Sequence, residues 1–123
     1  MPAQKRVLVA DDEFHMRLMV SSLLKNMGMA VVGEAANGAE AVKLFRSARP
    51  DLLLMDINMP VKNGDAALRE IIAEFPDARI IMLTSMADMH TVESCLAAGA
   101  ANFIRKDSPL AEITAAILET LPL

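Results

Sequence analysis

The most informative segment for the fold is Asp51-Leu52-Leu53-Leu54-Met55-Asp56-Ile57-Asn58-Met59-Pro60. Four consecutive apolar residues lead directly into a carboxylate, and a proline follows four positions later. A continuous apolar run of this length is typical of a strand that is covered on both faces. Such strands belong to parallel sheets between two layers of helices, so the segment favours an α/β fold.

Four more runs of the same kind lie on either side of it. The five predicted strands are residues 6–10, 30–35, 52–55, 79–83 and 102–104. Apolar residues at helical spacing follow each of them, at 16–27, 41–45, 68–75, 89–96 and 110–121. Five strand–helix units with right-handed crossovers predict one doubly wound, flavodoxin-like domain over residues 1–123, with strand order 2-1-3-4-5.

The composition excludes several classes of function. The chain has 123 residues and a formal charge of -4, and it lacks a basic run, so we expect no direct contact with nucleic acid. It has no secretory signal and no apolar stretch near 18 residues in length, so we expect a cytoplasmic protein without a membrane contact. Cys95 is the only cysteine and is interpreted as a small apolar residue on a helix.

Polar side chains follow the predicted strands at the point where each strand ends. Asp11 and Asp12 follow the first strand, Asp56 the third, Thr84 the fourth and Lys106 the fifth. In an open parallel sheet these ends share one edge, where ligands bind beside the reversal of strand order. Taken singly, these residues have ordinary explanations, such as a helix cap for an aspartate. Together they predict a site.

Three converging carboxylates repel one another unless they share a proton or bind a cation. Oxygen ligands in a partly open site suit Mg²⁺, with Mn²⁺ as a substitute. An aspartate nucleophile, a divalent cation, a lysine and a threonine are the components that phosphoryl transfer to a carboxylate requires. The residues therefore predict that Asp56 takes a phosphoryl group while Lys106 and Thr84 contact its oxygens.

The sequence resembles the receiver domains of two-component response regulators, especially the chemotaxis-type single-domain regulators. Four segments carry the resemblance: Val7-Leu-Val-Ala-Asp-Asp-Glu13, residues 51–60 with Gly64, Ile80-Ile-Met-Leu-Thr-Ser85, and Gly99-Ala-Ala-Asn-Phe-Ile-Arg-Lys106. The resemblance implies a phosphorelay signalling module and not an enzyme. Asp56 would accept the phosphoryl group from a histidine kinase or a histidine phosphotransfer protein.

The resemblance also implies roles for the neighbouring residues. Asp12 and Asp56 would bind Mg²⁺ through their side chains, Asp11 through a water molecule, and Asn58 through its backbone carbonyl. These four would form the metal site.

The family's switch pair would be Thr84 and Phe103, with Lys106 as its lysine at the site. The helix at 89–96, the strand at 102–104 and the helix at 110–121 would form the surface that contacts a downstream protein or output domain. The apolar arc of the last helix is wider than one core face needs, which fits either alanines tolerated at the surface or a partner or homodimer surface.

Two positions depart from the commonest family pattern. Asp107 stands where many members carry a cis proline, and a non-proline cis bond costs about 3–4 kcal/mol, so a trans peptide or local strain is expected. Phe103 stands where others have tyrosine, so it lacks a hydroxyl.

Three alternatives remain open on the residues alone. A small aspartate-nucleophile phosphatase would need Asp-x-Asp-x-Thr after the first strand, which Asp11-Asp12-Glu13 does not match. A flavodoxin-like electron carrier would need a phosphate loop and aromatic residues, yet the chain has no Trp or Tyr. A receiver that signals without phosphate is disfavoured by its intact acceptor residues.

Overall fold

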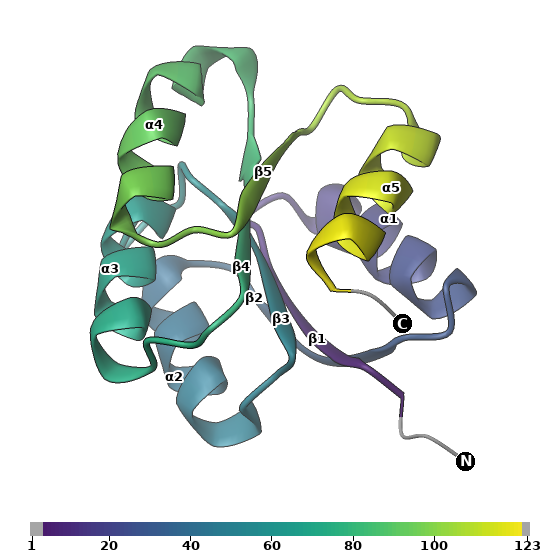
Figure 1. Cartoon of the computed structure of the whole chain (residues 1–123), viewed down its shortest axis with the longest axis horizontal. Helices are drawn as coiled ribbons and strands as arrows, with labels where there is room; N and C mark the ends of the chain where they lie inside the picture. Colours follow the sequence, from purple (N-terminus) through teal and green to yellow (C-terminus); the bar gives the residue numbers. More distant parts are fainter. Residues whose placement is uncertain (1–3, 122–123) are drawn as a thin grey trace.

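The computed structural model describes residues 4–121, which form a five-stranded parallel sheet of order β2-β1-β3-β4-β5 (Figure 1). The strands are β1 Arg6–Ala10, β2 Ala30–Ala35, β3 Leu52–Asp56, β4 Ile80–Thr84 and β5 Asn102–Arg105. The helices are α1 Phe14–Asn26, α2 Gly38–Ala48, α3 Gly64–Glu74, α4 Met89–Ala98 and α5 Leu110–Thr120, with a short 3₁₀ turn at Met86–Asp88 before α4. The predicted fold class and strand order are confirmed.

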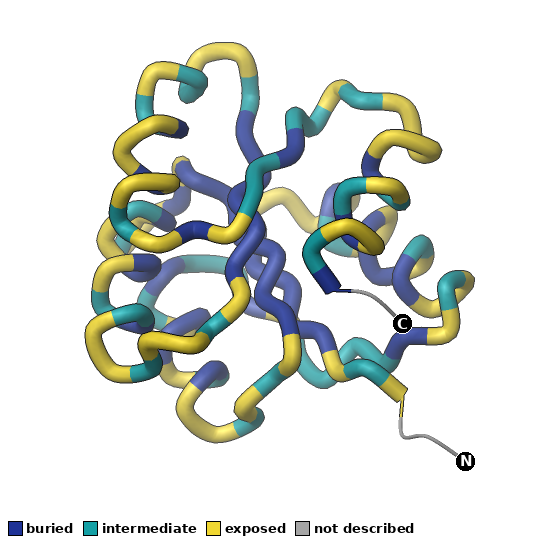
Figure 2. The backbone as a smooth tube through the Cα atoms, viewed as in Figure 1, coloured by how far each residue is buried: buried dark blue, intermediate teal, exposed yellow. Residues whose placement is uncertain are grey.

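The helices cover the sheet in two layers. In Figure 1, α2, α3 and α4 lie on one face, and α1 and α5 lie side by side on the other. Every residue of β3 and β4 is buried, as their continuous apolar sequences require (Figure 2). Each face of the sheet therefore has its own apolar core.

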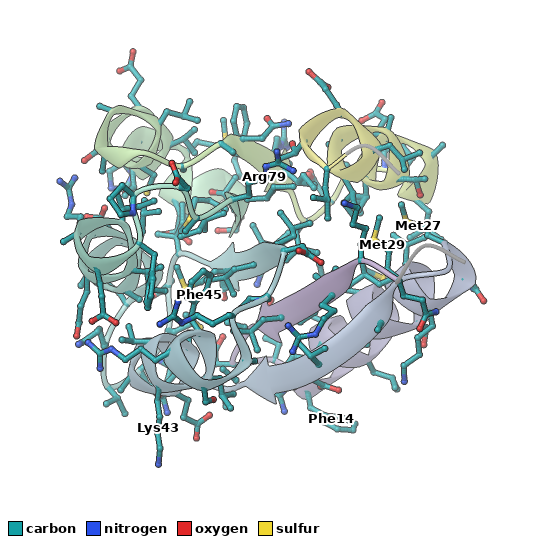
Figure 3. All side chains as sticks on the ribbon, turned by 60° about the horizontal axis from the view of Figure 1, so that its bottom comes forward. Phe14, Met27, Met29, Lys43, Phe45 and Arg79 are labelled. Atoms are coloured by element: carbon teal, nitrogen blue, oxygen red, sulfur yellow. The ribbon has the colours of Figure 1, made fainter. Side chains whose placement is uncertain are left out.

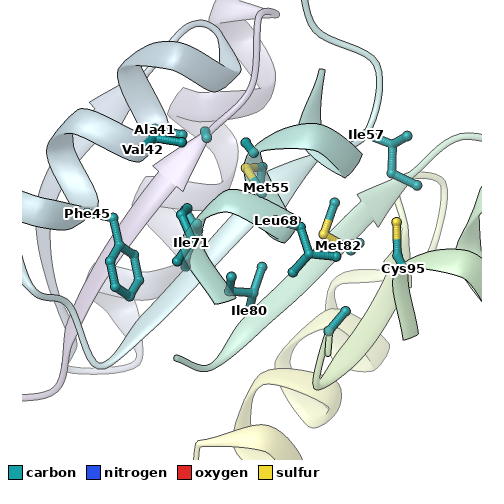
Figure 4. Packing of buried hydrophobic residues seen from close by; sticks show 14 of the residues in the cluster. Ala41, Val42, Phe45, Met55, Ile57, Leu68, Ile71, Ile80, Met82 and Cys95 are labelled. Carbon is teal, nitrogen blue, oxygen red and sulfur yellow. The ribbon is translucent and has the colours of Figure 1, made fainter. Parts of the chain in front are cut away.

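The larger core lies between the sheet and α2, α3 and α4. It contains Phe45 of α2, Ile71 of α3 and the strand residues Met55 and Met82 (Figure 4). Cys95 lies on α4, as expected for a small apolar helix residue, and is fully buried in the same cluster. Burying a large apolar side chain such as Phe45 or Ile71 contributes about 1.5–3 kcal/mol, so this layer holds α2, α3 and α4 against the sheet.

The smaller core joins α1 and α5 to the opposite face. Val20 and Leu24 of α1 meet Ile113 and Ile117 of α5 across the sheet residues of that face. Leu110, the first of the regularly spaced apolar residues in 110–121, is the first residue of α5, does not join this core and is 53% exposed. No helix among residues 4–121 is long and apolar enough to cross a membrane.

Candidate functional site

The carboxyl ends of the strands surround a polar pocket of about 140 Å³. Because β1 and β3 are neighbours, the residues that follow them face each other across the sheet edge. The pocket is lined by Asp12, Glu13, Asp56, Asn58, Ser85, Asp88 and Lys106. The structure thus brings together Asp12, Asp56, Asn58 and Lys106 of the predicted site.

Lys106 stands at the centre of the charged groups. Its Nζ lies 2.9 Å from Asp11 Oδ2, 3.0 Å from Asp56 Oδ2 and 3.2 Å from Glu13 Oε1. Its backbone N–H donates to the Thr84 carbonyl at 2.9 Å, which fixes the end of β5 to the end of β4. The ammonium is therefore held over the carboxylates from the fifth strand.

The charges at the site alter the pKa values of two groups. Burial raises the pKa of Asp56 to about 7, and the charges of Asp11 and Asp12 add to this effect, while Lys106 opposes it. Burial alone lowers the pKa of the Lys106 ammonium, but hydrogen bonds and charges from Asp11 and Asp56 outweigh burial and raise that pKa above its usual value. Asp56 is thus a carboxylate held in a costly buried position beside one fixed cation.

Asp11 lies below the pocket and is fully buried. Its backbone N–H donates to the Ala35 carbonyl of β2 at 2.9 Å, and its Oδ1 accepts the Glu13 N–H at 2.9 Å. Its other oxygen faces Lys106. Asp12, by contrast, is exposed and lines the pocket. The two adjacent carboxylates therefore have different surroundings.

A cation could be held by this set of groups. Asp11, Asp12, Glu13 and Asp56 each offer a carboxylate oxygen, and these oxygens lie within 4.8 Å of one another. Four carboxylates against one ammonium leave a net negative charge, and oxygen donors of this kind suit Mg²⁺ or Mn²⁺. The donor chemistry fits the expected metal.

The loop between β3 and α3 is packed tightly against the acceptor strand. Gly64 N–H donates to the Ile57 carbonyl at 2.7 Å, and a Cβ at Gly64 would lie 2.0 Å from the Asp56 carbonyl oxygen. Asn63 caps α3 by accepting the Ala66 N–H at 2.8 Å. Glycine is therefore required where the helix begins beneath the site.

The predicted switch residues lie on the adjacent strands. Thr84 is fully buried, and its Oγ1 donates to the Ser85 carbonyl at 3.0 Å. Phe103 is partly buried and packs against the larger core. Residues 4–121 contain no cis peptide bond, so the Lys106–Asp107 peptide is trans, one of the two possibilities expected for a non-proline residue there.

Three residues that line the pocket were not predicted from the sequence, namely Glu13, Ser85 and Asp88. Glu13 follows Asp12 directly, so its position after the first strand was a usable signal. Ser85 donates its hydroxyl to Asp88 Oδ2 at 3.0 Å across the 3₁₀ turn. That turn has no apolar periodicity, so the sequence offered no signal that would place Asp88 at the site.

Large apolar side chains are exposed on segments that follow the strands at this edge of the sheet. Phe14, Val61 and Met86 are 67%, 85% and 67% exposed. They belong to the segments that follow β1, β3 and β4, and Phe14 points away from the body of the protein (Figure 3). We call these three residues the apolar rim.

Comparison with known proteins gives one consistent answer. Residues 7–118 match the family model described as the response regulator receiver domain. The chemotaxis protein CheY of Bacillus subtilis (strain 168) is 41% identical over 116 residues, which cover 94% of this chain and 97% of that protein.

Two solved structures have the same fold. The signal receiver domain of the putative response regulator NarL from Mycobacterium tuberculosis superposes with a TM-score of 0.88 at 34% identity, covering 96% of each chain. A CheX-CheY-BeF3-Mg²⁺ complex from Borrelia burgdorferi gives a TM-score of 0.89 at 27% identity, covering 94% of this chain and 87% of that one.

Proposed function

The chain belongs to the response regulator receiver domain family, and we propose that it accepts a phosphoryl group on Asp56 with the help of Mg²⁺. The observation that carries this proposal is the 3.0 Å contact between Lys106 Nζ and Asp56 Oδ2 inside an acidic pocket. Family membership favours a signalling role over the phosphatase and electron-carrier alternatives. We expect the protein to act in the cytoplasm.

Asp56 supplies the nucleophile. One of its carboxylate oxygens attacks the phosphorus of a phosphohistidine, the new O–P bond forms as the N–P bond breaks, and the imidazole leaves with the bonding electron pair. Asp56 must be ionised for this attack, so its raised pKa makes the reaction slower in acid. Lys106 balances negative charge on the phosphoryl oxygens as it does now on the carboxylate.

The residues that would hold Mg²⁺ are Asp12 and Asp56 through their side chains, Asn58 through its carbonyl, and Asp11 through a water molecule. A bound Mg²⁺ would supply positive charge to the phosphoryl oxygens. Asp12, Asp56 and Asn58 line the pocket, which supports direct contact, whereas the burial of Asp11 supports an indirect one.

The apolar rim supports docking of a phosphodonor protein. Phe14, Val61 and Met86 are exposed on the segments that follow β1, β3 and β4, at the edge of the sheet where the pocket lies. Exposed apolar side chains that gather on one face of a protein can mark an interaction site. The donor would be a histidine kinase or histidine phosphotransfer protein that contacts this rim with apolar side chains.

Output would follow from Thr84 and Phe103. If the Thr84 hydroxyl leaves Ser85 for a phosphoryl oxygen, space opens beside β5 for Phe103 to turn inward. This change would bias an existing equilibrium at α4, β5 and α5. Leu96, Leu110 and Leu118 are exposed on α4 and α5 and would contact a downstream protein, an output domain or a second copy of the chain.

Beryllofluoride, which mimics a phosphoryl group on a carboxylate, offers a direct test. With Mg²⁺ present, backbone NMR shifts should change at residues 56–64, at Thr84 and through α4, β5 and α5. The same addition to Asp56→Asn should change nothing. Changes confined to α1 and α2 in the wild type would rule out the output surface.

A further inference from the structure

Arg17, on the first turn of α1, contacts three other residues, which are Asp11, Glu34 and Phe14. Its Nη1 donates to the Asp11 backbone carbonyl at 2.5 Å, and its Nε lies 3.4 Å from Glu34 Oε1 on β2. The guanidinium carbon lies 5.7 Å from the centre of the Phe14 ring. The side chain is only 16% exposed, so this arginine is held in place and is not free in solvent.

The carbonyl that Arg17 contacts belongs to the peptide group between Asp11 and Asp12. A peptide group is planar, so fixing its oxygen also fixes the direction of the Asp12 N–H and the position of the Asp12 Cα. The other end of Asp11 is already fixed, because its N–H donates to Ala35 and its Oδ1 accepts from Glu13. Arg17 therefore completes the immobilisation of the turn that follows β1.

The Asp12 carboxylate has no such support of its own. Within residues 4–121 it takes part in no hydrogen bond or ion pair, and it is exposed in the pocket. Its direction toward the pocket must then come from the backbone. The only charged side chain that donates to this stretch of backbone in the described residues is Arg17.

We propose that Arg17 is a positioning residue that orients Asp12 for a divalent cation by holding the Asp11 carbonyl. The inference rests on the proposed function, in which Asp12 is a metal ligand. A planar guanidinium can bridge the carbonyl and the Glu34 carboxylate at once, and a single ammonium cannot reproduce both contacts. Replacing a residue that orients a metal ligand without touching the metal itself commonly weakens metal binding.

Titration of the folded protein with Mg²⁺ alone tests this role. Calorimetry or NMR is needed, because the chain has no Trp or Tyr to report binding. Arg17→Gln should raise the Kd for Mg²⁺ about tenfold. Asp56 phosphorylation should return toward the wild-type rate once Mg²⁺ is saturating. The matched control is Arg46→Gln, since Arg46 also pairs with a glutamate, Glu74 at 3.0 Å, but on the α2–α3 surface.

The Arg46→Gln control should stay within about twofold of the wild-type Kd. If Arg17 only anchors α1, Arg17→Gln lowers the melting temperature and leaves the Mg²⁺ Kd unchanged, and this result would overturn the proposal. Should Arg17→Gln not fold, Arg17→Lys keeps the charge and must raise the Kd in the same direction. A wild-type protein that binds no Mg²⁺ would instead refute the proposed function itself.

Discussion

Lys106 Nζ lies 3.0 Å from Asp56 Oδ2, so a fixed cation stands beside a buried carboxylate whose pKa is raised to about 7. Asp56 ends β3 and Lys106 follows β5, and β4 lies between these two strands in the sheet. The folded chain thus maintains an arrangement that costs free energy when Asp56 is ionised, and this cost can be measured.

The first prediction concerns stability against pH. The folded-state pKa of Asp56 lies above the unfolded value of 3.8, so the folded state binds the proton more tightly. Protonation of Asp56 therefore favours the folded state in acid. This contribution to the free energy of unfolding is lost as the pH rises from about 4 to 7. Asparagine does not ionise, so the Asp56→Asn protein keeps this free energy at high pH and should be more stable than the wild type at pH 8. Each pKa unit corresponds to about 1.4 kcal/mol, so the gain should be a few kcal/mol.

Urea unfolding at pH 8 and pH 5, with a chelator present, measures this gain. The advantage of Asp56→Asn should shrink markedly at pH 5. An equal difference between the two proteins at both pH values would show that Asp56 titrates normally in the folded state.

The second prediction separates the two carboxylates that follow β1. Asp12→Asn should weaken Mg²⁺ binding more than Asp11→Asn does, because Asp12 is exposed in the pocket while Asp11 is buried against Lys106 and Glu13. Calorimetric titration of both variants checks the order. The reverse order would mean that the direct ligand has been assigned to the wrong residue.

The third prediction concerns the start of α3. Gly64→Ala should destabilise the protein by about 2 kcal/mol, because the new Cβ would lie 2.0 Å from the Asp56 carbonyl and force the acceptor strand to shift. It should also slow phosphorylation of Asp56. Gly28→Ala is the control: Gly28 has a φ of +83° but open space around it, so only backbone strain of about 1 kcal/mol is expected. Equal phosphorylation rates in both variants would contradict the argument.

The fourth prediction tests coupling to the output surface. Phe103→Ala should leave labelling of Asp56 nearly intact, because Phe103 does not line the pocket. It should reduce the NMR shift changes that beryllofluoride causes in α4 and α5. A full response of α4 in the Phe103→Ala protein would exclude Phe103 from the switch.

The fold and the approximate position of the site could be predicted because each rests on local sequence. Buried strands have continuous apolar runs, and topology brings the residues after β1, β3 and β5 to one edge. The predicted ends of β3, β4 and β5 fall one residue short because the polar residues Asp56, Thr84 and Arg105 continue the sheet pairing. The observed β4 also begins one residue later than predicted, at Ile80.

The remaining details depend on side-chain reach between distant segments. Glu13 contacts Lys106 across 93 positions of sequence, and Arg17 connects α1 to β2. Val61 adopts a φ of +68°, which is uncommon for a β-branched residue and has no sequence signal. Apolar periodicity describes which face of an element is buried, so it carries no information about such polar contacts.

The role of Asp56 as phosphoryl acceptor is tested most simply by the intact mass of the protein after incubation with acetyl phosphate and Mg²⁺. The wild type should gain the mass of one phosphoryl group, and hydroxylamine should remove it, as expected for an acyl phosphate. Asp56→Asn should gain none. Undiminished labelling of Asp56→Asn would contradict the assignment of Asp56 as the phosphoryl acceptor.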